Sequence, residues 1–517
     1  MSEIQKQQKE LETKLWDMAN TLRGSMEAGE FKNYILSVIF YYYLSLRTEK
    51  YMEKALENDH ISYEEAWKND ELREGLIRAS IRDLGYVMEP DHLFHNIIKK
   101  IGTNGFDMEF MQTALNSIID STKGEESEDA FRGLFDDISL NSPKLGSTNK
   151  EREEIIVKLF ASVDALTFDL QDAKMDVLGN TYEYLIGKFA ESAGKKAGEF
   201  YTPPGPAKLL CMLASVGLTD VKSAADPTCG SGSLLLHLRD YVNVRLLYGQ
   251  EKITQTMNLA RMNMILRGVP YQNFMIFNGD TLVNDNFLEE KFHIQVANPP
   301  YSSKYTLTED FKNDPRFNFY GKFPPKSRAD YAFLQHMIYH MDDSDGRIAV
   351  LLPHGVLFRK NGEDVIRKNI IENQNLLDAV IGLPANLFYG APLPVALLVL
   401  KKNRSDNNDN ILFIDASKEF KHGKNKNELT EENIKKIYQT YIERKDAEKY
   451  AHVATMDEIR KNDFNLNIPR YVDTYDPEPE IVLSDVEERM AKRRQEIASV
   501  SEKLKDSFAQ LELKFPF

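Results

Sequence analysis

The sequence predicts an α/β protein in three parts: a helical N-terminal domain, a doubly wound domain around a mostly parallel sheet, and a C-terminal helical tail. Residues 1–150 carry helical periodicity and no strand signal. Residues 151–475 alternate helical stretches with short apolar runs, the pattern of a parallel sheet covered by helices. Residues 476–517 are helical and charged. A chain of 517 residues is also too long for one compact core.

Helical spacing marks the N-terminal part. Apolar residues near its start recur every three or four positions and predict one apolar helix face: Leu11, Leu15, Met18, Leu22 and Met26. The apolar stretch Tyr34–Leu46 is too short to cross a bilayer and predicts a buried helix. Polar segments at 122–128 and 141–150 predict loops, and the second is the expected boundary with the middle part.

Short apolar runs predict the strands of the middle part. Several are almost continuously apolar, as expected for strands covered by helices on both faces. The runs are Val221–Ala225, Phe274–Phe277, His293–Ala297, Ile348–Leu352, Leu377–Ile381 and Val395–Leu400. The polar segment Asn403–Asn410 that follows them predicts a surface loop.

Composition narrows the class of protein. A hydrophobic fraction of 42% and a charged fraction of 28% exclude a largely disordered chain. The two cysteines, Cys211 and Cys229, exclude a disulfide framework or thiolate zinc site, and we expect no metal. The N-terminus lacks the apolar core of a signal peptide, so we expect a cytoplasmic protein with no membrane contact. The net charge of −15 argues against unaided binding of nucleic acid, because phosphate contacts need clustered Lys and Arg.

A glycine-rich loop, Asp226–Gly232, follows the first predicted strand. Gly230 and Gly232, on either side of Ser231, allow a sharp turn and close approach to a ligand. In open α/β sheets ligands bind at the carboxyl ends of the strands, and Asp226 there suits a cationic ammonium group. A purely structural turn is the alternative for this loop alone, and the three-glycine fingerprint of nucleotide dehydrogenases is absent.

Two acidic residues end later predicted strands. Glu251 lies about twenty residues after the loop, where an acidic residue binds two ribose hydroxyls. Asp280 ends Asn278-Gly279-Asp280, where it is placed to accept a hydrogen bond from an adenine amino group. Alone, Glu251 also fits a solvated helix start, and Asp280 also fits a capped Asn-Gly turn. Together with the glycine loop they predict a cofactor site.

The tetrapeptide Asn298-Pro299-Pro300-Tyr301 follows the predicted strand His293–Ala297. An exocyclic amino nitrogen on a heteroaromatic ring is a poor nucleophile, because its lone pair is delocalised. Two acceptors aimed at its hydrogens favour a pyramidal nitrogen; the Asn298 side chain and the Pro299 carbonyl supply them, and the prolines fix the backbone rigidly. Tyr301 is suited to stack on a base swung out of the helix. A proline-rich strand exit without chemistry is the alternative.

In this order the motifs resemble those of S-adenosylmethionine-dependent amino-methyltransferases. The upstream phrase Gly198-Glu199-Phe200-Tyr201-Thr202-Pro203-Pro204 is similar to that family's first cofactor motif, and its position resembles the gamma arrangement of DNA amino-methyltransferases. The phrases Asp330–Phe333, Ile348–Pro353 and Leu383–Phe388 are similar to later family motifs. The resemblance implies that S-adenosylmethionine binds to Gly198–Pro203 and the residues above. It also implies that Phe388 is a second stacking partner for a flipped base.

Over nearly the whole chain the layout resembles the modification subunit of type I restriction-modification systems. That resemblance implies methylation of adenine N6 in double-stranded DNA by a bacterial or archaeal protein. It implies a separate specificity subunit that reads the sequence, two copies of this chain per specificity subunit, and a restriction subunit in the full complex. Only 117 residues follow Leu400, fewer than a large target-recognition domain needs, and no phosphate-binding loop of an ATP-driven motor is present.

The C-terminal part, 476–517, carries apolar residues at heptad spacing: Met490, Ile497, Leu504 and Leu511. Val486 and Val500 fall near the second seam position, which Arg493 and Ser507 interrupt. The pattern fits a coiled-coil contact with a partner, the specificity subunit, as well as a helix packed on its own protein.

Two other functions fit the same residues. Methyltransferases that act on glutamine side chains in proteins also use Asn-Pro-Pro-Tyr, because an amide nitrogen poses the same problem. They are usually much shorter. A scaffold that binds cofactor without catalysis is the third hypothesis, and the intact tetrapeptide argues against it. The residues alone do not separate adenine from cytosine, since both amino groups suit the tetrapeptide.

Overall fold

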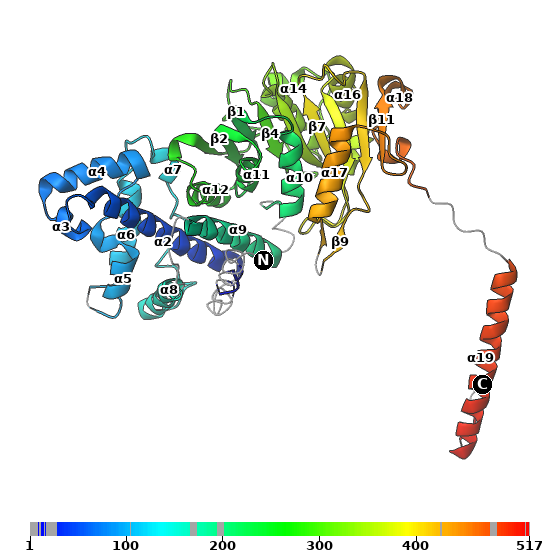
Figure 1. Cartoon of the computed structure of the whole chain (residues 1–517), viewed down its shortest axis with the longest axis horizontal. Helices are drawn as coiled ribbons and strands as arrows, with labels where there is room; N and C mark the ends of the chain where they lie inside the picture. The colour runs from blue at the N-terminus through cyan, green and yellow to red at the C-terminus, as the bar shows by residue number, and fades with distance from the viewer. Residues whose placement is uncertain are drawn as a thin grey trace. The chain divides into compact units, whose positions relative to one another are not determined.

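The structure, a computed structural model, describes residues 9, 12–14, 16, 28–103, 105–165, 173–193, 201–423, 426–475, 483–511 and 513–515 (Figure 1). It divides into two compact units, Met1–Val472 and Asp473–Phe517. Among these residues no helix is long and apolar enough to cross a membrane. The predicted apolar helix face at Leu11, Leu15, Met18, Leu22 and Met26 lies outside the described residues.

The first part of the large unit is helical, as predicted. Its helices are α2 Ala28–Leu56, α3 Tyr63–Trp67, α4 Asp70–Leu84, α5 Phe94–Lys100, α6 Met108–Asp120, α7 Glu128–Phe131 and α8 Asn149–Asp164. Side-chain caps start several of them: Asn69 accepts from two backbone amides of α4, and Thr148 forms a capping box with Glu151. The predicted helix over Tyr34–Leu46 lies within α2, and almost all of that stretch is buried. Helix α8 packs against α2 and α5.

The second part of the large unit is built around a nine-stranded sheet. Its strands are β1 Asp220–Asp226, β2 Asn243–Glu251, β3 Phe274–Asn278, β4 Ile294–Ala297, β5 Arg347–Pro353, β6 Leu377–Gly382, β7 Val395–Lys401, β8 Asn410–Asp415 and β11 Ala451–Thr455. The order across the sheet is β11-β8-β6-β7-β5-β4-β1-β2-β3. Five of its neighbouring pairs are parallel, and β7 and β11 run antiparallel to their neighbours. The prediction of a mostly parallel sheet is confirmed.

The chain reverses its direction of growth at β1. It proceeds from β1 to β2 and β3 on one side, and then returns to place β4 on the other side of β1. Ligands of open α/β sheets bind outside the carboxyl ends of strands at such a switch point. The loop after β1 and the loop after β4 therefore lie at the same switch point, where a ligand is expected. These are the glycine loop and the Asn298–Tyr301 tetrapeptide.

Helices cover both faces of the sheet. They are α9 Ala173–Ala193, α10 Pro204–Ala214, α11 Ser233–Leu238, α12 Thr254–Leu266, α13 Glu309–Asn313, α14 Pro315–Asn318, α15 Asp330–Tyr339, α16 Glu363–Lys368, α17 Glu431–Glu443 and α18 Met456–Lys461. Alternate residues of β5 belong to two different cores: Ala349 and Leu351 pack with α10 and α17, whereas Ile348 and Val350 pack with α15. This alternation confirms a doubly wound arrangement.

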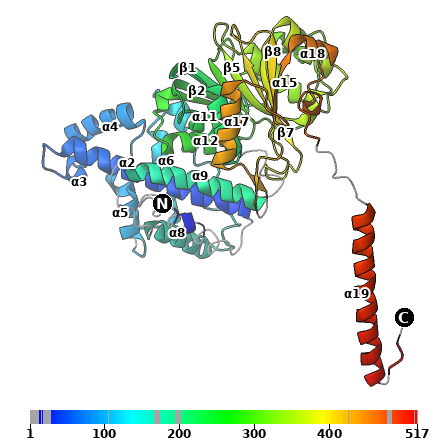
Figure 2. The ribbon, with the colours of Figure 1, turned by 45° about the vertical axis from the view of Figure 1, so that its right-hand side comes forward.

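The helical part packs on the sheet domain through α12 and α9. Helices α2 and α9 lie side by side (Figures 1 and 2). Tyr43 donates from its hydroxyl to the Ile265 carbonyl at 3.0 Å, and the Asn258 amide donates to the Gly133 carbonyl at 2.9 Å. The N-terminal helices therefore support the helix that follows β2.

Each of the six predicted apolar runs corresponds to an observed strand with ends that differ by one residue or less, and the strand expected to end at Glu251 is β2. The outer strands β8 and β11, and the short hairpin of β9 Lys421–His422 and β10 Asn427–Glu428, were not predicted. In the small unit the predicted helix is α19 Leu483–Gln510, which buries no residue. Its heptad residues Met490, Ile497, Leu504 and Leu511 are exposed.

Candidate active site

The glycine loop turns sharply between β1 and α11. Gly230 and Gly232 have φ angles of 54° and 77°, a region in which L side chains are strained. A Cβ at Gly232 would lie 3.0 Å from the Cε of Met264 on α12. On the neighbouring strand, a Cβ at Gly249 would lie 2.9 Å from the Sγ of Cys229. The absence of side chains at these glycines thus allows the loop to pack closely against β2 and α12.

Glu251 bridges the loop and the start of α12. Its Oε2 accepts from the Gly230 amide at 3.1 Å, and its Oε1 accepts from the Ile253 amide at 2.8 Å. Glu251 is buried, and burial raises the pKa of its carboxyl although these amides lower it. These two backbone amides hold the Glu251 carboxylate in place at the end of β2. The sequence analysis predicts that this carboxylate binds the ribose of a cofactor.

Asp226 is fully buried at the end of β1, where its Oδ1 accepts from the Thr228 amide at 2.9 Å. Burial raises its pKa to about 7; the Thr228 amide opposes this shift and the nearby Glu251 carboxylate adds to it. Two carboxyl groups thus share a buried region at the ends of β1 and β2. A cationic ligand group there would relieve their repulsion.

Ser231 supplies a second sign of a ligand. Its side chain is 1% exposed, and its Oγ has no hydrogen-bond partner among the described residues. A buried hydroxyl without a partner is costly in a native protein, so such atoms usually meet a ligand or water. Together with the buried carboxyls, this orphan hydroxyl fits a polar, positively charged cofactor at the loop.

Asp280 lies beyond β3, more open to solvent. Its Oδ2 pairs with Lys252 at 2.8 Å, and its Oδ1 accepts from the Leu282 amide at 3.1 Å. The next residue, Thr281, donates from its hydroxyl to the carbonyl of Pro227 in the glycine loop. This hydrogen bond joins the loops after β1 and β3, as expected if both loops line one ligand site.

The tetrapeptide after β4 contacts the upstream phrase. The Asn298 amide donates to the Thr202 Oγ1 at 3.1 Å, across 96 positions of sequence. Tyr201, Thr202 and Pro203 are buried, and Pro204 starts α10. Gly198, Glu199 and Phe200 lie outside the described residues. Two motifs that the sequence analysis singled out separately thus meet at one point.

Asn298 already has a partner on its acceptor atom. The Tyr301 hydroxyl donates to the Asn298 Oδ1 at 2.6 Å. Burial raises the pKa of Tyr301 well above its usual value, and Asp330 raises it further, so the hydroxyl stays a proton donor at neutral pH. An amide oxygen accepts two hydrogen bonds, so the Asn298 Oδ1 retains a second acceptor position beside the Tyr301 hydroxyl.

Tyr301 and Phe388 meet edge to face. Their ring centroids are 6.0 Å apart with an interplanar angle of 88°. A base stacked between two rings needs parallel planes about 7 Å apart, two aromatic contacts of about 3.5 Å. The two predicted stacking residues are therefore neighbours, and at least one ring must turn before a base can enter.

A buried ion network follows the tetrapeptide. Asp330 accepts from the amide of Ser302 at 2.7 Å, where Ser302 has a φ of 52°. Its other oxygen pairs with Arg359 at 2.5 Å, and Arg359 also pairs with the fully buried Glu363 at 2.7 Å. The phrase Asp330–Phe333 matched a family motif, but the role of Asp330 was not predicted. The distance of Asp330 from Ser302 along the sequence gives no sign that Asp330 stabilises the turn after Tyr301.

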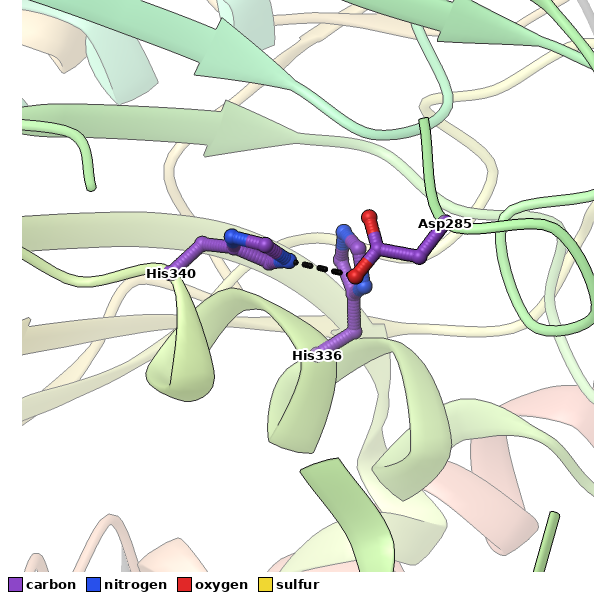
Figure 3. Close-up of side chains that lie close together, drawn as sticks. All are labelled: Asp285, His336 and His340. Carbon is purple, nitrogen blue, oxygen red and sulfur yellow. Dashed lines mark hydrogen bonds and ion pairs between the residues drawn. The ribbon is translucent and has the colours of Figure 1, made fainter. Parts of the chain in front are cut away.

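One cluster has the composition of a metal site: Asp285, His336 and His340 (Figure 3). His340 contacts Asp285 at 2.9 Å, and its other nitrogen contacts the Glu290 carbonyl at 2.7 Å.

A guanidinium group lies against this cluster. Arg316 donates to the Nδ1 of His336 at 2.9 Å and lies 3.7 Å from Asp285. Burial lowers the pKa of His336 far below its usual value, as a neutral acceptor for Arg316 requires. The guanidinium takes the cation position here, and it also donates to the Thr281 carbonyl at 2.8 Å, which supports the loop of Asp280.

Two family profiles match this chain. The N-6 DNA Methylase family matches residues 173–480, and the HsdM N-terminal domain matches residues 11–163. The first covers the sheet domain with the glycine loop and the tetrapeptide. The second covers the helical part, α8 included.

Curated relatives match over most of their length. The chain is 36% identical over 488 residues to the type I restriction enzyme MpnII methylase subunit of Mycoplasma pneumoniae, covering 90% of this chain and 89% of that protein. It is 31% identical over 493 residues to the type I restriction enzyme MjaIX methylase subunit of Methanocaldococcus jannaschii, covering 90% and 84%. Among solved structures, the type I restriction-modification methyltransferase subunit of Streptococcus thermophilus superposes with a TM-score of 0.83 at 39% identity, covering 90% of this chain and all of that one.

Proposed function

The chain belongs to the N-6 DNA methylase family, as a methylase subunit of type I restriction-modification systems, and on that premise we propose how it acts. It transfers a methyl group from S-adenosylmethionine to N6 of adenine in double-stranded DNA. One observation supports this most directly: Asn298 of the tetrapeptide donates to Thr202 of the cofactor phrase. This contact joins the loop after β4 to the segment before α10, and so supports neighbouring sites for the amino group and the cofactor.

The chain's own residues prepare the amino group. Asn298 Oδ1 and the Pro299 carbonyl accept its two hydrogens and leave its lone pair free for attack. Pro299 and Pro300 fix the backbone that carries these acceptors. When bound, the cofactor supplies an electrophilic methyl group on a sulfonium.

Cofactor binding is assigned to the residues around the switch point. Asp226 and Glu251 offer buried carboxyls, Ser231 an unpaired hydroxyl, and Gly230 and Gly232 close backbone approach. Asp280 and the phrase Gly198–Pro203 complete the proposed set. The unpaired Ser231 hydroxyl is the observation that favours a ligand here over a structural turn.

Recognition of the target sequence is assigned to another chain. We propose that this subunit binds a specificity subunit through residues 476–517, where the apolar seam of α19 is exposed. Two copies per specificity subunit, and a restriction subunit in the full complex, complete the proposed assembly. The chain alone is then expected to bind cofactor and to methylate DNA poorly.

Transfer of a labelled methyl group tests the proposal. The chain is purified with its specificity subunit and incubated with tritiated S-adenosylmethionine, double-stranded DNA and total protein. Label in DNA at N6 of adenine is the expected result, with far less label when the specificity subunit is absent. Label in protein glutamine would instead support the second hypothesis, and no transfer by the complex would leave only the scaffold hypothesis.

A further inference from the structure

Five cationic side chains near the tetrapeptide are exposed and unpaired. They are Lys304, Lys322, Lys326, Arg328 and Lys360, and we call them the basic rim. Within the described part of the chain, none of them takes part in an ion pair or a side-chain hydrogen bond. Lys304 follows Tyr301 by three positions, and Arg328 precedes Asp330 by two.

The rim lies on three backbone segments that are bound together. The Tyr305 amide donates to the Lys326 carbonyl at 3.1 Å, and the Ala329 amide donates to the Ser303 carbonyl at 2.9 Å. A Cβ at Gly362 would lie 2.6 Å from the Phe323 carbonyl oxygen and 3.6 Å from the Lys322 Cβ. The segments 302–305, 322–329 and 359–362 therefore form one surface beside the tetrapeptide.

Three other cationic side chains in the same region have acidic partners, unlike the basic rim. Lys312 pairs with Glu309 at 2.6 Å, Arg316 with Asp314 at 2.6 Å, and Arg359 with Asp330 at 2.5 Å. The Arg316 and Arg359 pairs belong to buried contacts, whereas the Lys312 pair lies on the exposed surface of α13. The rim residues have no such acidic partner among the described residues, in a chain whose net charge is −15. Five free positive charges gathered on such a chain indicate an anionic partner.

We propose that the basic rim binds the backbone phosphates of the DNA strand on either side of the flipped adenine. The inference rests on the proposed function, because the tetrapeptide beside the rim must receive that base. A flipped base remains attached to its strand, so phosphates necessarily pass close to Asn298 and Tyr301. Side chains of the length of Lys and Arg reach such phosphates from an exposed surface.

Phosphate contacts have a measurable signature, because each one releases condensed counterions. The logarithm of the binding constant falls against the logarithm of salt concentration with a slope of about −0.9 per phosphate neutralised. Five contacts from the rim contribute about 4.5 to that slope. This contribution does not depend on the DNA sequence. Recognition of the sequence remains the proposed role of the specificity subunit.

The experiment compares matched pairs of charge-neutralising substitutions in the complex with the specificity subunit. Lys326→Gln with Arg328→Gln removes two rim charges. Lys68→Gln with Lys445→Gln, at exposed lysines of the helical part and of the turn after α17, is the control. DNA affinity is measured from about 50 to 300 mM salt, and cofactor affinity and methyl transfer at saturating DNA are measured in parallel.

We expect the rim pair to lower the salt slope by about 1.8, while the control pair leaves it unchanged. Cofactor affinity and transfer at saturating DNA should match the wild type. Lys326→Arg, which retains the charge, should retain the slope. An unchanged slope in the rim pair, in a complex that still methylates DNA, overturns the inference and leaves the proposed function intact. Weaker assembly with the specificity subunit at an unchanged slope also overturns it, in favour of a protein partner.

Discussion

The loops after β1 and β4 lie at neighbouring strand ends but are built differently. The glycine loop after β1 is bound mainly through its backbone: Gly230 donates to Glu251, and Gly232 leaves room for Met264. The tetrapeptide after β4 is bound through side chains, to Thr202 on one side and within itself through Tyr301. One loop is held by backbone contacts, whereas the acceptor oxygen of the other already accepts one side-chain hydrogen bond, from Tyr301.

This difference predicts a division of effects. Substitutions around the glycine loop should change cofactor affinity, because that loop presents a fixed surface. Substitutions around the tetrapeptide should change turnover, because its acceptors are used only when the amino group arrives.

Asn298→Ala should give the largest effect. Loss of one positioned acceptor at the reacting group typically lowers turnover by about 10²–10³-fold. Cofactor affinity should remain close to that of the wild type, because within the described part of the cofactor phrase Asn298 contributes a single side-chain hydrogen bond, to Thr202. Single-turnover methylation at saturating cofactor, with calorimetric titration of the cofactor, measures both quantities. A variant that binds cofactor poorly but turns over normally when saturated would contradict the division.

Asp330→Ala should have the second-largest effect. The substitution removes the acceptor of the Ser302 amide and leaves Arg359 with Glu363 alone. A displacement of about 1 Å at the tetrapeptide is enough to lower turnover about 10²-fold. Breaking a buried ion pair also lowers the free energy of unfolding by about 3–5 kcal/mol, which chemical denaturation measures.

Two controls separate position from stability for Asp330. Asp330→Asn retains an acceptor for the Ser302 amide and should recover much of the turnover lost in the alanine variant. Glu363→Gln perturbs the same network without touching Ser302, and should lower stability more than turnover. If Asp330→Asn and Asp330→Ala are equally slow while Glu363→Gln is as slow as both, Asp330 acts through stability alone.

Most of the glycine-loop side was visible in the sequence, whereas the support of the tetrapeptide was not. Asp226, Glu251 and Asp280 each follow an apolar run, and parallel strands bring such positions to one edge of a sheet. Asp330 and Thr202 act across long separations in sequence, so no local spacing reveals them. The strand β8 contains an apolar run, Ile411–Ile414, of the same kind that marked the others, so its signal was present in the sequence. The edge strand β11 has partly exposed residues and carries a weaker pattern.

The pH dependence of cofactor binding tests the role of Asp226 in the loop after β1. Burial raises the pKa of Asp226 to about 7, so its carboxyl is half protonated at neutral pH. A cationic cofactor prefers the ionised form, so binding below pH 7 must release a proton. Affinity should therefore fall by up to about tenfold for each pH unit below 7 and level off above it. Asp226→Asn should bind weakly at every pH with a flatter profile. A wild-type profile that is flat from pH 6 to 8 would show that Asp226 does not interact with the cofactor's charge.

Tyr301→Phe should give the smallest effect. Phenylalanine retains the ring for stacking and removes only the hydroxyl that donates to Asn298. That hydrogen bond contributes about 1 kcal/mol and leaves the second lone pair of Asn298 Oδ1 open, so its loss should change turnover by about fivefold at most. Tyr301→Ala removes the ring and should weaken base capture by about 1–3 kcal/mol. Steady-state turnover, with the fluorescence of 2-aminopurine at the target position, separates the two variants. If Tyr301→Phe is as impaired as Tyr301→Ala, the hydroxyl itself takes part in the reaction.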